Sequence, residues 1–447
     1  MTPALAEAFN REMGAARAAW AAGHADVTFR LLERAHILGQ RHLWPHILTH
    51  LWMLRVGWRH RDWREVFGQL LRLAATLPAA LFGWVPVGNT GGANVSALRP
   101  MPVPPEFGYL FRDTSKPRRT LVILLRIFLI VFLAITGAFL AMEWRRMALA
   151  KTIETQSSVS ADLHITDLGS TQRLEIIPLV NWHAAAPELA TEAAVAYLVR
   201  TDHATVLYDL GYNARREAHS PLKRNMEQLG ISMDEIDAIF ISHRHRDHVA
   251  GLAAERSGRL QVEGSLPNLQ GKMIFTPENI IYPGSTPLIV DAPKRLFQGV
   301  ATTGPIIRSL FMGPVKEQSL VVHVAGRGLV VIVGCGHQTV PALLDRLADA
   351  FAEPLFGMVG DFHYPVPEGR LRIAGLDAQR LFASGDGPFK PITMTQAQAE
   401  LKMLDQLQLL ALGGHDTSDE VIDWAADRFG DRFRRVNVGE PIIVKAP

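Results

Sequence analysis

The longest apolar run of the chain covers residues 121–142 and contains a single charged residue, Arg126. A helix over these 22 residues is about 33 Å long at 1.5 Å per residue, close to the thickness of the hydrocarbon layer of a membrane. Arg126 lies near the first end, where its side chain reaches the headgroups, and Trp144 follows the run as interfacial aromatic residues do. The pattern therefore predicts one transmembrane helix over residues 121–142.

Before this run, residues 4–77 are rich in Ala, Leu and Arg and place apolar residues at helical spacing. Gly23 and the stretch 59–62 interrupt the pattern, which indicates helix–turn–helix pairs. We expect a small all-α domain over residues 1–85, followed by a linker over residues 86–120 that is rich in Pro and Gly.

After the run, a linker is expected over residues 143–168 and a larger domain over residues 169–447. This part mixes apolar runs of strand length with amphipathic helical segments. One hairpin turns at 202–204 and a second turns in the Gly-rich stretch 325–328. The pattern predicts an α+β domain of one strand-rich core.

The chain has 447 residues, 48% of them hydrophobic and 20% charged, which provides apolar mass for more than one core. Its net charge of +2 is unevenly distributed, because residues 1–119 hold 15 Lys and Arg against 8 Asp and Glu. Such asymmetry favours two parts in different surroundings and argues against a nucleic-acid-binding protein. The lone cysteine, Cys335, excludes an internal disulfide.

The clearest chemical motif is IFISHRHRDHVAGL, residues 239–252, in which four side chains able to bind a metal follow an apolar strand within six residues. The stretch 221–237 before this strand and the segment after His248 are both predicted to be helices. Alternate histidines of an extended turn can reach one ion, and the Asp and His at the start of the second helix can reach another. Imidazole and carboxylate ligands suit zinc, and iron or manganese less exclusively. The four candidates are His243, His245, Asp247 and His248.

The HxHxDH pattern after a strand resembles the signature of the metallo-β-lactamase superfamily. The resemblance spans about residues 170–445 and implies an αβ/βα sandwich of two mixed sheets with helices outside. The stretches GCGH, GDFH and GGHDT add a likeness to the subgroup that includes dihydropterin-type synthases, and to bacterial members with an N-terminal membrane anchor.

By this resemblance the remaining ligands come from later strand ends. His337 and His415 match the third and fifth motif histidines, and either Asp361 or His363 completes the site. Asp209, in the YDLG stretch, matches an aspartate that orients a metal-bound histidine from behind. Cys335 is interpreted as a small residue in a tight turn, with a thiol close to the metal as the alternative.

The resemblance implies two zinc ions that hold a hydroxide between them, with Asp247 as the catalytic residue that orients this nucleophile and carries a proton. His243, His245 and His337 would hold one ion, and Asp247, His248 and His415 the other. The expected activity is hydrolysis of a small ester, lactone, lactam or phosphoester. The alternatives are a dihydropterin-type synthase, or a metal-bound sensor or scaffold whose helical domain binds a protein partner.

The positive residues that flank the apolar run give a slight bias, which favours a cytoplasmic N-terminus. We therefore expect a single-pass protein of the inner membrane with its catalytic domain in the periplasm. The N-terminal helices resemble a pair of tetratricopeptide-like hairpins, and residues 10–105 also resemble a small bacterial helical family of unknown function.

The N-terminal region is rich in histidine. His46 and His50 are four residues apart and can share a helix face, but no glutamate completes a zincin HExxH pattern. Packed or surface histidines are the favoured interpretation, with metal binding as the alternative. The histidines of this region are His24, His36, His42, His46, His50 and His60.

Overall fold

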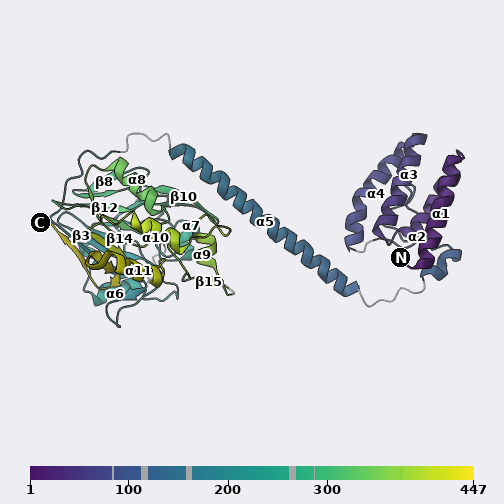
Figure 1. Cartoon of the computed structure of the whole chain (residues 1–447). Coiled ribbons are helices and arrows are strands. Elements are labelled where there is room, and N and C mark those ends of the chain that lie inside the picture. Colours follow the sequence, from purple (N-terminus) through teal and green to yellow (C-terminus); the bar gives the residue numbers. More distant parts are fainter. Residues whose placement is uncertain (83–84, 112–118, 158–163, 261–267, 286, 374) are drawn as a thin grey trace. The chain divides into compact units, whose positions relative to one another are not determined.

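The computed structural model describes residues 1–82, 85–111, 119–157, 164–260, 268–285, 287–373 and 375–447. These residues divide into two compact units, Met1–Ala138 and Phe139–Pro447. The first unit is helical and the second is built on two sheets (Figure 1).

Four helices form the first unit, packed in chain order one against the next (Figure 1). The breaks lie where the sequence indicates them: Gly23 has a φ of 79° and Arg61 a φ of 57°, so both adopt the left-handed conformation that ends a helix. The helices are α1 (Pro3–Ala21), α2 (Ala25–Gly39), α3 (Leu43–His60) and α4 (Trp63–Phe82).

Part of the expected linker packs against these helices. The 3₁₀ helix η1 (Pro105–Phe111) buries Phe107, and Arg34 of α2 lies over that ring at 4.6 Å and pairs with Glu106. Asn89 is buried as well and caps its own loop through hydrogen bonds to the carbonyls of Ser96 and Arg99. The helical domain therefore includes most of residues 85–111.

The apolar run lies in one long helix, α5 (Arg119–Ser157), so the expected linker 143–168 begins inside a helix. An 18-residue window within its segment Arg126–Ile153 has a mean hydropathy of 2.2, and α5 is the one helix in the described residues that is long and apolar enough to cross a membrane. None of that apolar window is buried.

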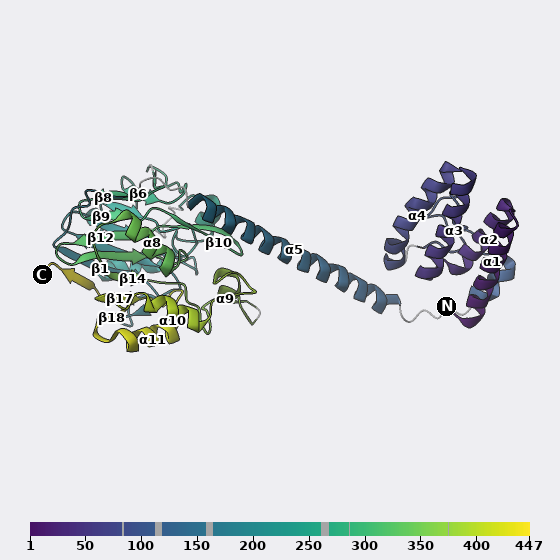
Figure 2. The same ribbon diagram turned by 45° about the horizontal axis from the view of Figure 1, so that its top comes forward.

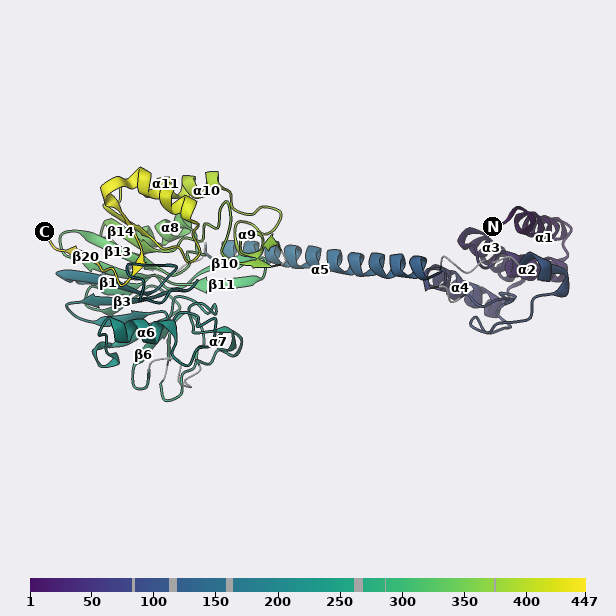
Figure 3. The same cartoon turned by 90° about the horizontal axis from the view of Figure 1, so that it is seen from below.

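Two seven-stranded sheets stack face to face in the second unit, with helices on both outer faces (Figure 3). The first sheet has the order β20-β1-β3-β4-β5-β6-β7, and the second has the order β18-β17-β14-β13-β12-β9-β8. Between the sheets lies a core that both supply, with Ile176 and Val199 from the first sheet and Val330 and Val359 from the second. The observed layers agree with the expected α+β sandwich of the αβ/βα kind.

Strand bounds follow the apolar runs of the sequence. The first sheet contains β1 (Arg173–Val180), β3 (Ala196–Thr201), β4 (Thr205–Tyr208), β5 (Ala238–Phe240), β6 (Met273–Thr276), β7 (Pro287–Ile289) and β20 (Ile442–Lys445). The second contains β8 (Lys294–Phe297), β9 (Val300–Thr302), β12 (Leu320–Val324), β13 (Gly328–Val333), β14 (Leu355–Gly360), β17 (Leu409–Leu412) and β18 (Phe433–Arg435). Three short pairs complete the strands: β2 (His183–Ala184) with β19 (Asn437–Val438), β10 (Ile306–Leu310) with β11 (Gly313–Glu317), and β15 (Arg372–Ile373) with β16 (Leu376–Asp377).

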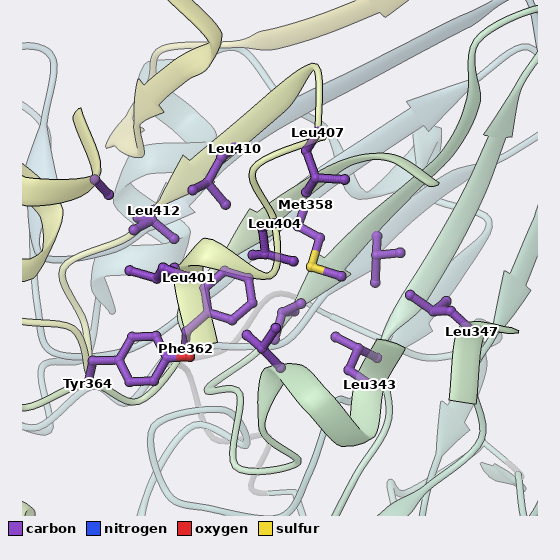
Figure 4. Packing of buried hydrophobic residues seen from close by; sticks show 14 of the residues in the cluster. Leu343, Leu347, Met358, Phe362, Tyr364, Leu401, Leu404, Leu407, Leu410 and Leu412 are labelled. Carbon is purple, nitrogen blue, oxygen red and sulfur yellow. The ribbon is translucent and has the colours of Figure 1, made fainter. Parts of the chain in front are cut away.

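Helices cover the outer face of each sheet. On the second sheet lie α8 (Val340–Ala350), α10 (Met394–Lys402) and α11 (Asp419–Phe429), seen together with β17 and β18 in Figure 2. Their apolar faces meet Met358 and Leu410 of the sheet in one core (Figure 4). On the first sheet lie α6 (Pro221–Gln228) and α7 (Leu252–Ser257), and α9 (Ala378–Ala383) follows β16.

Two helix expectations differ from the structure. The segment 221–237 is helical only to Gln228, because Gly230 has a φ of 66°, and a short 3₁₀ turn, η2 (Met233–Glu235), follows. After His248 the chain stays irregular until Leu252, since Ala250 and Gly251 have φ values of 60° and 124°. Asp247 and His248 therefore stand on a loop rather than on a helix.

Candidate metal centre

The candidate ligands lie where parallel strands end at a common edge. β4 and β5 are parallel neighbours in the first sheet, and β13, β14 and β17 are parallel neighbours in the second. Strands that run in the same direction bring their carboxyl ends to one edge. The loops after these strands carry Asp209, residues 243–248, His337, residues 361–363 and His415.

His243, His245 and His337 form the first group of converging side chains. His245 Nδ1 lies 3.0 Å from His243 Nε2 and 3.1 Å from His337 Nε2. Two strands of different sheets thus place three imidazole nitrogens around one point, as a single ion requires.

Asp247, His248 and His415 form the second group, together with Cys335. His415 Nε2 lies 3.1 Å from Asp247 Oδ2, and the Cys335 thiol lies 2.9 Å from His248 Nε2 and 3.4 Å from His415 Nε2. The thiol therefore stands among the candidate ligands, in agreement with the alternative interpretation of this residue.

Asp209 lies directly behind His248, as the resemblance implies. Its Oδ2 accepts hydrogen bonds from His248 Nδ1 at 2.6 Å and from Ser242 Oγ at 2.7 Å, and its Oδ1 accepts one from Ser242 N at 2.7 Å. Since the carboxylate only accepts, the His248 proton is on Nδ1 and the Nε2 lone pair points into the group. Asp209 has a φ of 55°, a left-handed conformation that Asp tolerates better than most residues.

The same hydroxyl fixes a second tautomer. Ser242 Oγ gives its proton to Asp209, so it accepts from His243 Nδ1, which lies 3.0 Å away. The His243 Nε2 lone pair is therefore directed at the first group. One buried Asp–Ser pair thus orients one histidine of each group.

Of Asp361 and His363, the histidine is the one that lies among the other candidate ligands. His363 joins Cys335, His337 and Asp416 in a third group that overlaps the other two. Its Nδ1 donates to Asp416 Oδ2 at 3.0 Å, and its buried Nε2 has no hydrogen-bond partner in the described part of the chain. Asp361 instead accepts from the Asn181 amide and from the backbone N–H of Asp416, outside every group.

Asp416 and Glu317 are two buried acids that the sequence interpretation missed. Asp416 Oδ2 lies 3.2 Å from His415 Nε2. Its position next to His415 in the GGHDT stretch is the sequence signal that could have identified it. Glu317 accepts hydrogen bonds from the backbone N–H groups of Cys335, Gly336 and His337. It fixes the loop that carries both the thiol and a histidine.

Burial and neighbouring charges shift the titration of the site. Burial, together with the other imidazoles, lowers the pKa of His243 and His337 well below the ordinary value, so both are neutral ligands near pH 7. Burial also lowers the pKa of His415, but Asp416 and Asp247 outweigh it and raise the pKa well above 6.5. Burial raises the pKa of Glu317 to about 7.

The donor atoms of these residues fit bound divalent metal. In the described part of the chain, His363 Nε2 is buried and has no hydrogen-bond partner, while its Nδ1 is held by Asp416. Buried polar atoms without partners are costly, which a bound ion and its water would relieve. A donor set rich in imidazole nitrogens, with carboxylate oxygens and one thiol sulfur, suits zinc best among common ions.

Comparison with known families assigns both parts of the chain. Residues 191–410 match the family model described as the Metallo-beta-lactamase superfamily. Residues 3–111 match the model described as Protein of unknown function (DUF3703).

Individual relatives are more distant. The N-acyl homoserine lactonase AiiB of Agrobacterium fabrum is 30% identical over 112 residues, which cover 19% of this chain and 41% of the lactonase. The chain thus spans less than half the length of this curated relative.

Solved structures with some likeness include Tm1679, a metal-dependent hydrolase of the beta-lactamase superfamily, which is 18% identical with a TM-score of 0.42 over 61% of this chain and 99% of that one. Another is an isothiocyanate hydrolase from Delia radicum gut bacteria, 15% identical with a TM-score of 0.34 over 61% of this chain and 100% of that one. The family matches carry the assignment: the chain contains a metallo-beta-lactamase superfamily domain in its second unit, preceded by a DUF3703 domain.

Proposed function

We propose that the second unit is a metal-dependent hydrolase of small esters or lactones. One observation carries the proposal: six histidines and two carboxylates from four loops converge at a single edge of the two sheets, in overlapping groups. In the proposed assignment His243, His245 and His337 hold one ion and Asp247, His248 and His415 the other. His363 and Asp416 lie beside both groups.

Bound at this place, two divalent ions supply a Lewis acid and a water of lowered pKa. The chain provides the orientation and the proton acceptor. Asp209 and Ser242 hold the tautomers of His248 and His243, as described above. Asp247 has a side chain that is 20% exposed, so it is open to a substrate while hydrogen-bonded to His415. We propose that Asp247 accepts the proton released when water attacks the carbonyl carbon.

The lactone class is supported by the likeness to AiiB, which is an N-acyl homoserine lactonase. Lactams and phosphoesters are the neighbouring classes that the same chemistry serves. A zinc-loaded chain is to be assayed with an N-acyl homoserine lactone, 4-nitrophenyl acetate, a cephalosporin and bis(4-nitrophenyl) phosphate. We expect turnover of the lactone above the others.

His245→Ala tests the role of the site, and His219→Ala is its matched control, since His219 is a half-exposed histidine of the same unit paired with Glu227. We expect H245A to lose at least 100-fold in kcat/KM and H219A to keep it. Equal turnover by H245A and the unaltered chain contradicts the proposal. Turnover of none of the four substrates favours the dihydropterin-type or sensor alternatives instead.

We also propose that α5 anchors the protein in the inner membrane, with the N-terminus in the cytoplasm. The support is its apolar surface, since none of the apolar window is buried and Phe128, Leu133 and Ile135 are each more than half exposed. The second half of the helix belongs to the second unit, where the Phe139 ring lies 4.7 Å from Phe311 and Ser309 donates to the Arg146 carbonyl.

A C-terminal alkaline phosphatase fusion tests this topology, because the reporter is active only in the periplasm. We expect an active fusion in the membrane fraction and an inactive one when the N-terminus carries the reporter. Reporter activity in the soluble fraction contradicts the anchor. A C-terminal fusion that is inactive as alkaline phosphatase but active as β-galactosidase, which works only in the cytoplasm, contradicts the orientation.

A further inference from the structure

Three buried histidines of the DUF3703 domain form a cluster separate from the hydrolase site. His36 comes from α2, and His46 and His50 come from α3. Their exposed fractions are 3%, 6% and 2%, and the ring centroids of all three pairs lie 4.7 Å apart. One nitrogen of each ring lies within 4.8 Å of the other two, an arrangement able to hold one ion.

Two of the three tautomers are set by hydrogen bonds on the far side of each ring. His36 Nδ1 lies 2.8 Å from the Asn89 carbonyl, which only accepts, so the proton is on Nδ1. His50 Nδ1 lies 2.6 Å from Gln69 Oε1. The Gln69 amide nitrogen donates to Glu65 and to the Gly91 carbonyl, so its oxygen is the group that faces His50.

The lone pairs of His36 Nε2 and His50 Nε2 therefore face inward. His46 Nε2 lies 3.0 Å from His50 Nε2, so the third ring meets the second at the same point. This pattern, in which a carbonyl or amide holds the outer nitrogen and the inner nitrogen is free, is typical of metal-binding histidines.

A packed core of neutral histidines explains the cluster less well. Among the described residues, the buried and inward-facing His36 Nε2 has no hydrogen-bond partner. A hydrogen bond from His46 to His50 satisfies one inner nitrogen and leaves that of His36 without a partner.

A cavity of about 70 Å³ adjoins the cluster, and Arg72 and Gln40 line it beside the three histidines. This volume holds a water or a small anion beside an ion. Arg72 also donates to the carbonyls of Gly92 and Val95, so the guanidinium is fixed next to the cavity. The three histidines and the Arg72 guanidinium therefore line one cavity.

We propose that His36, His46 and His50 bind one divalent ion of the zinc class, with a water or small anion as the fourth ligand beside Arg72. Three imidazoles and an open position suit Zn²⁺, Co²⁺ and Cu²⁺. The site is independent of the hydrolase centre, and its ion contributes to the stability of the helical domain because it binds the folded state.

The test counts Co²⁺ ions bound per full-length chain in detergent, by titration and elemental analysis. We expect His46→Gln and His50→Gln each to bind one ion fewer than the unaltered chain. The matched control is His24→Ala, an exposed histidine of the same domain, which is expected to keep the full number. Both glutamine variants binding as many ions as the unaltered chain would overturn the proposal.

A second variant keeps the test decisive even if the glutamine variants unfold the helical domain. His245→Ala combined with His415→Ala removes ligands of the hydrolase centre and leaves the DUF3703 domain unaltered. This chain is expected to keep one Co²⁺, and the addition of His46→Gln to remove it. A double variant that retains its helical circular dichroism and binds no ion overturns the proposal regardless of how the single variants fold.

Discussion

Replacement of Asp209 by Asn isolates the orienting role of the buried carboxylate. The left-handed φ of 55° at this position is compatible with Asn, so the backbone is expected to stay in place. The amide keeps an oxygen for Ser242 N but turns a donor toward His248 Nδ1, which lies 2.6 Å from the carboxylate in the unaltered chain. His248 then carries its proton on Nε2, the nitrogen proposed to bind the ion.

The expected loss is 10- to 100-fold in the affinity of the ion proposed to be held by Asp247, His248 and His415, or about 1.4–2.7 kcal/mol. The stability of the metal-free chain should change little or rise, because burial raises the pKa of Asp209 and the variant removes that buried charge. Affinity and stability therefore move in different directions, which separates orientation of the ligand from simple damage to the fold.

The assay titrates metal-free protein with Zn²⁺ against a chelator of known affinity and follows turnover in parallel. The control is Asp237→Asn, an exposed carboxylate of the same sheet that accepts from Thr205 N. We expect D209N to bind one Zn²⁺ more weakly than the unaltered chain and the other ions with unchanged affinity. If His248→Ala loses one ion but D209N binds every ion with unchanged affinity, the orienting role of Asp209 is refuted.

Further predictions concern the fold and its titration. Leu401→Ala, in the core of Figure 4, should lower the free energy of unfolding by about 2–5 kcal/mol in urea titrations, and a loss below about 1 kcal/mol contradicts the packing. Glu317→Gln should cost about 1–3 kcal/mol and weaken metal binding, because an amide nitrogen cannot accept from the backbone of the loop; unchanged melting and metal content would count against this role. The hydrogen bond from Thr171 and those from the backbone lower the pKa of Asp202 below 3.8, so its contribution of about 0.5 kcal/mol is present above pH 3.8 and lost as the pH falls below it. The stability difference between the unaltered chain and Asp202→Asn should therefore shrink between pH 6 and pH 3, and a constant difference speaks against it.

The sequence allowed the layers and most ligand positions to be predicted, since both follow from local patterns. Apolar runs of four to eight residues marked β1, β3, β13 and β14, and the polar residues that follow such strands marked their ends. The structure brings His337 and His415 to the HxHxDH loop, as the resemblance implied.

Other features depend on contacts that no local pattern specifies. Glu317 reads as a surface charge in the stretch VKEQS, yet it is buried because three backbone N–H groups converge on it. Asp361 and His363 are two residues apart, so their spacing in the sequence does not distinguish which of them lies among the other candidate ligands, and His363 has a positive φ of 53° that no local pattern indicates. The cluster of His36 with His46 and His50 likewise joins two helices, so the spacing within α3 revealed only part of it.

Two ions bound together at the edge of the two sheets would be visible in a crystal of the zinc-loaded chain, measured on both sides of the zinc absorption edge. We expect two anomalous peaks about 3.5–4 Å apart, one against His243, His245 and His337 and the other against Asp247, His248 and His415. A saturated crystal with no peak among these residues, or with one peak outside both groups, would contradict the proposed two-ion site.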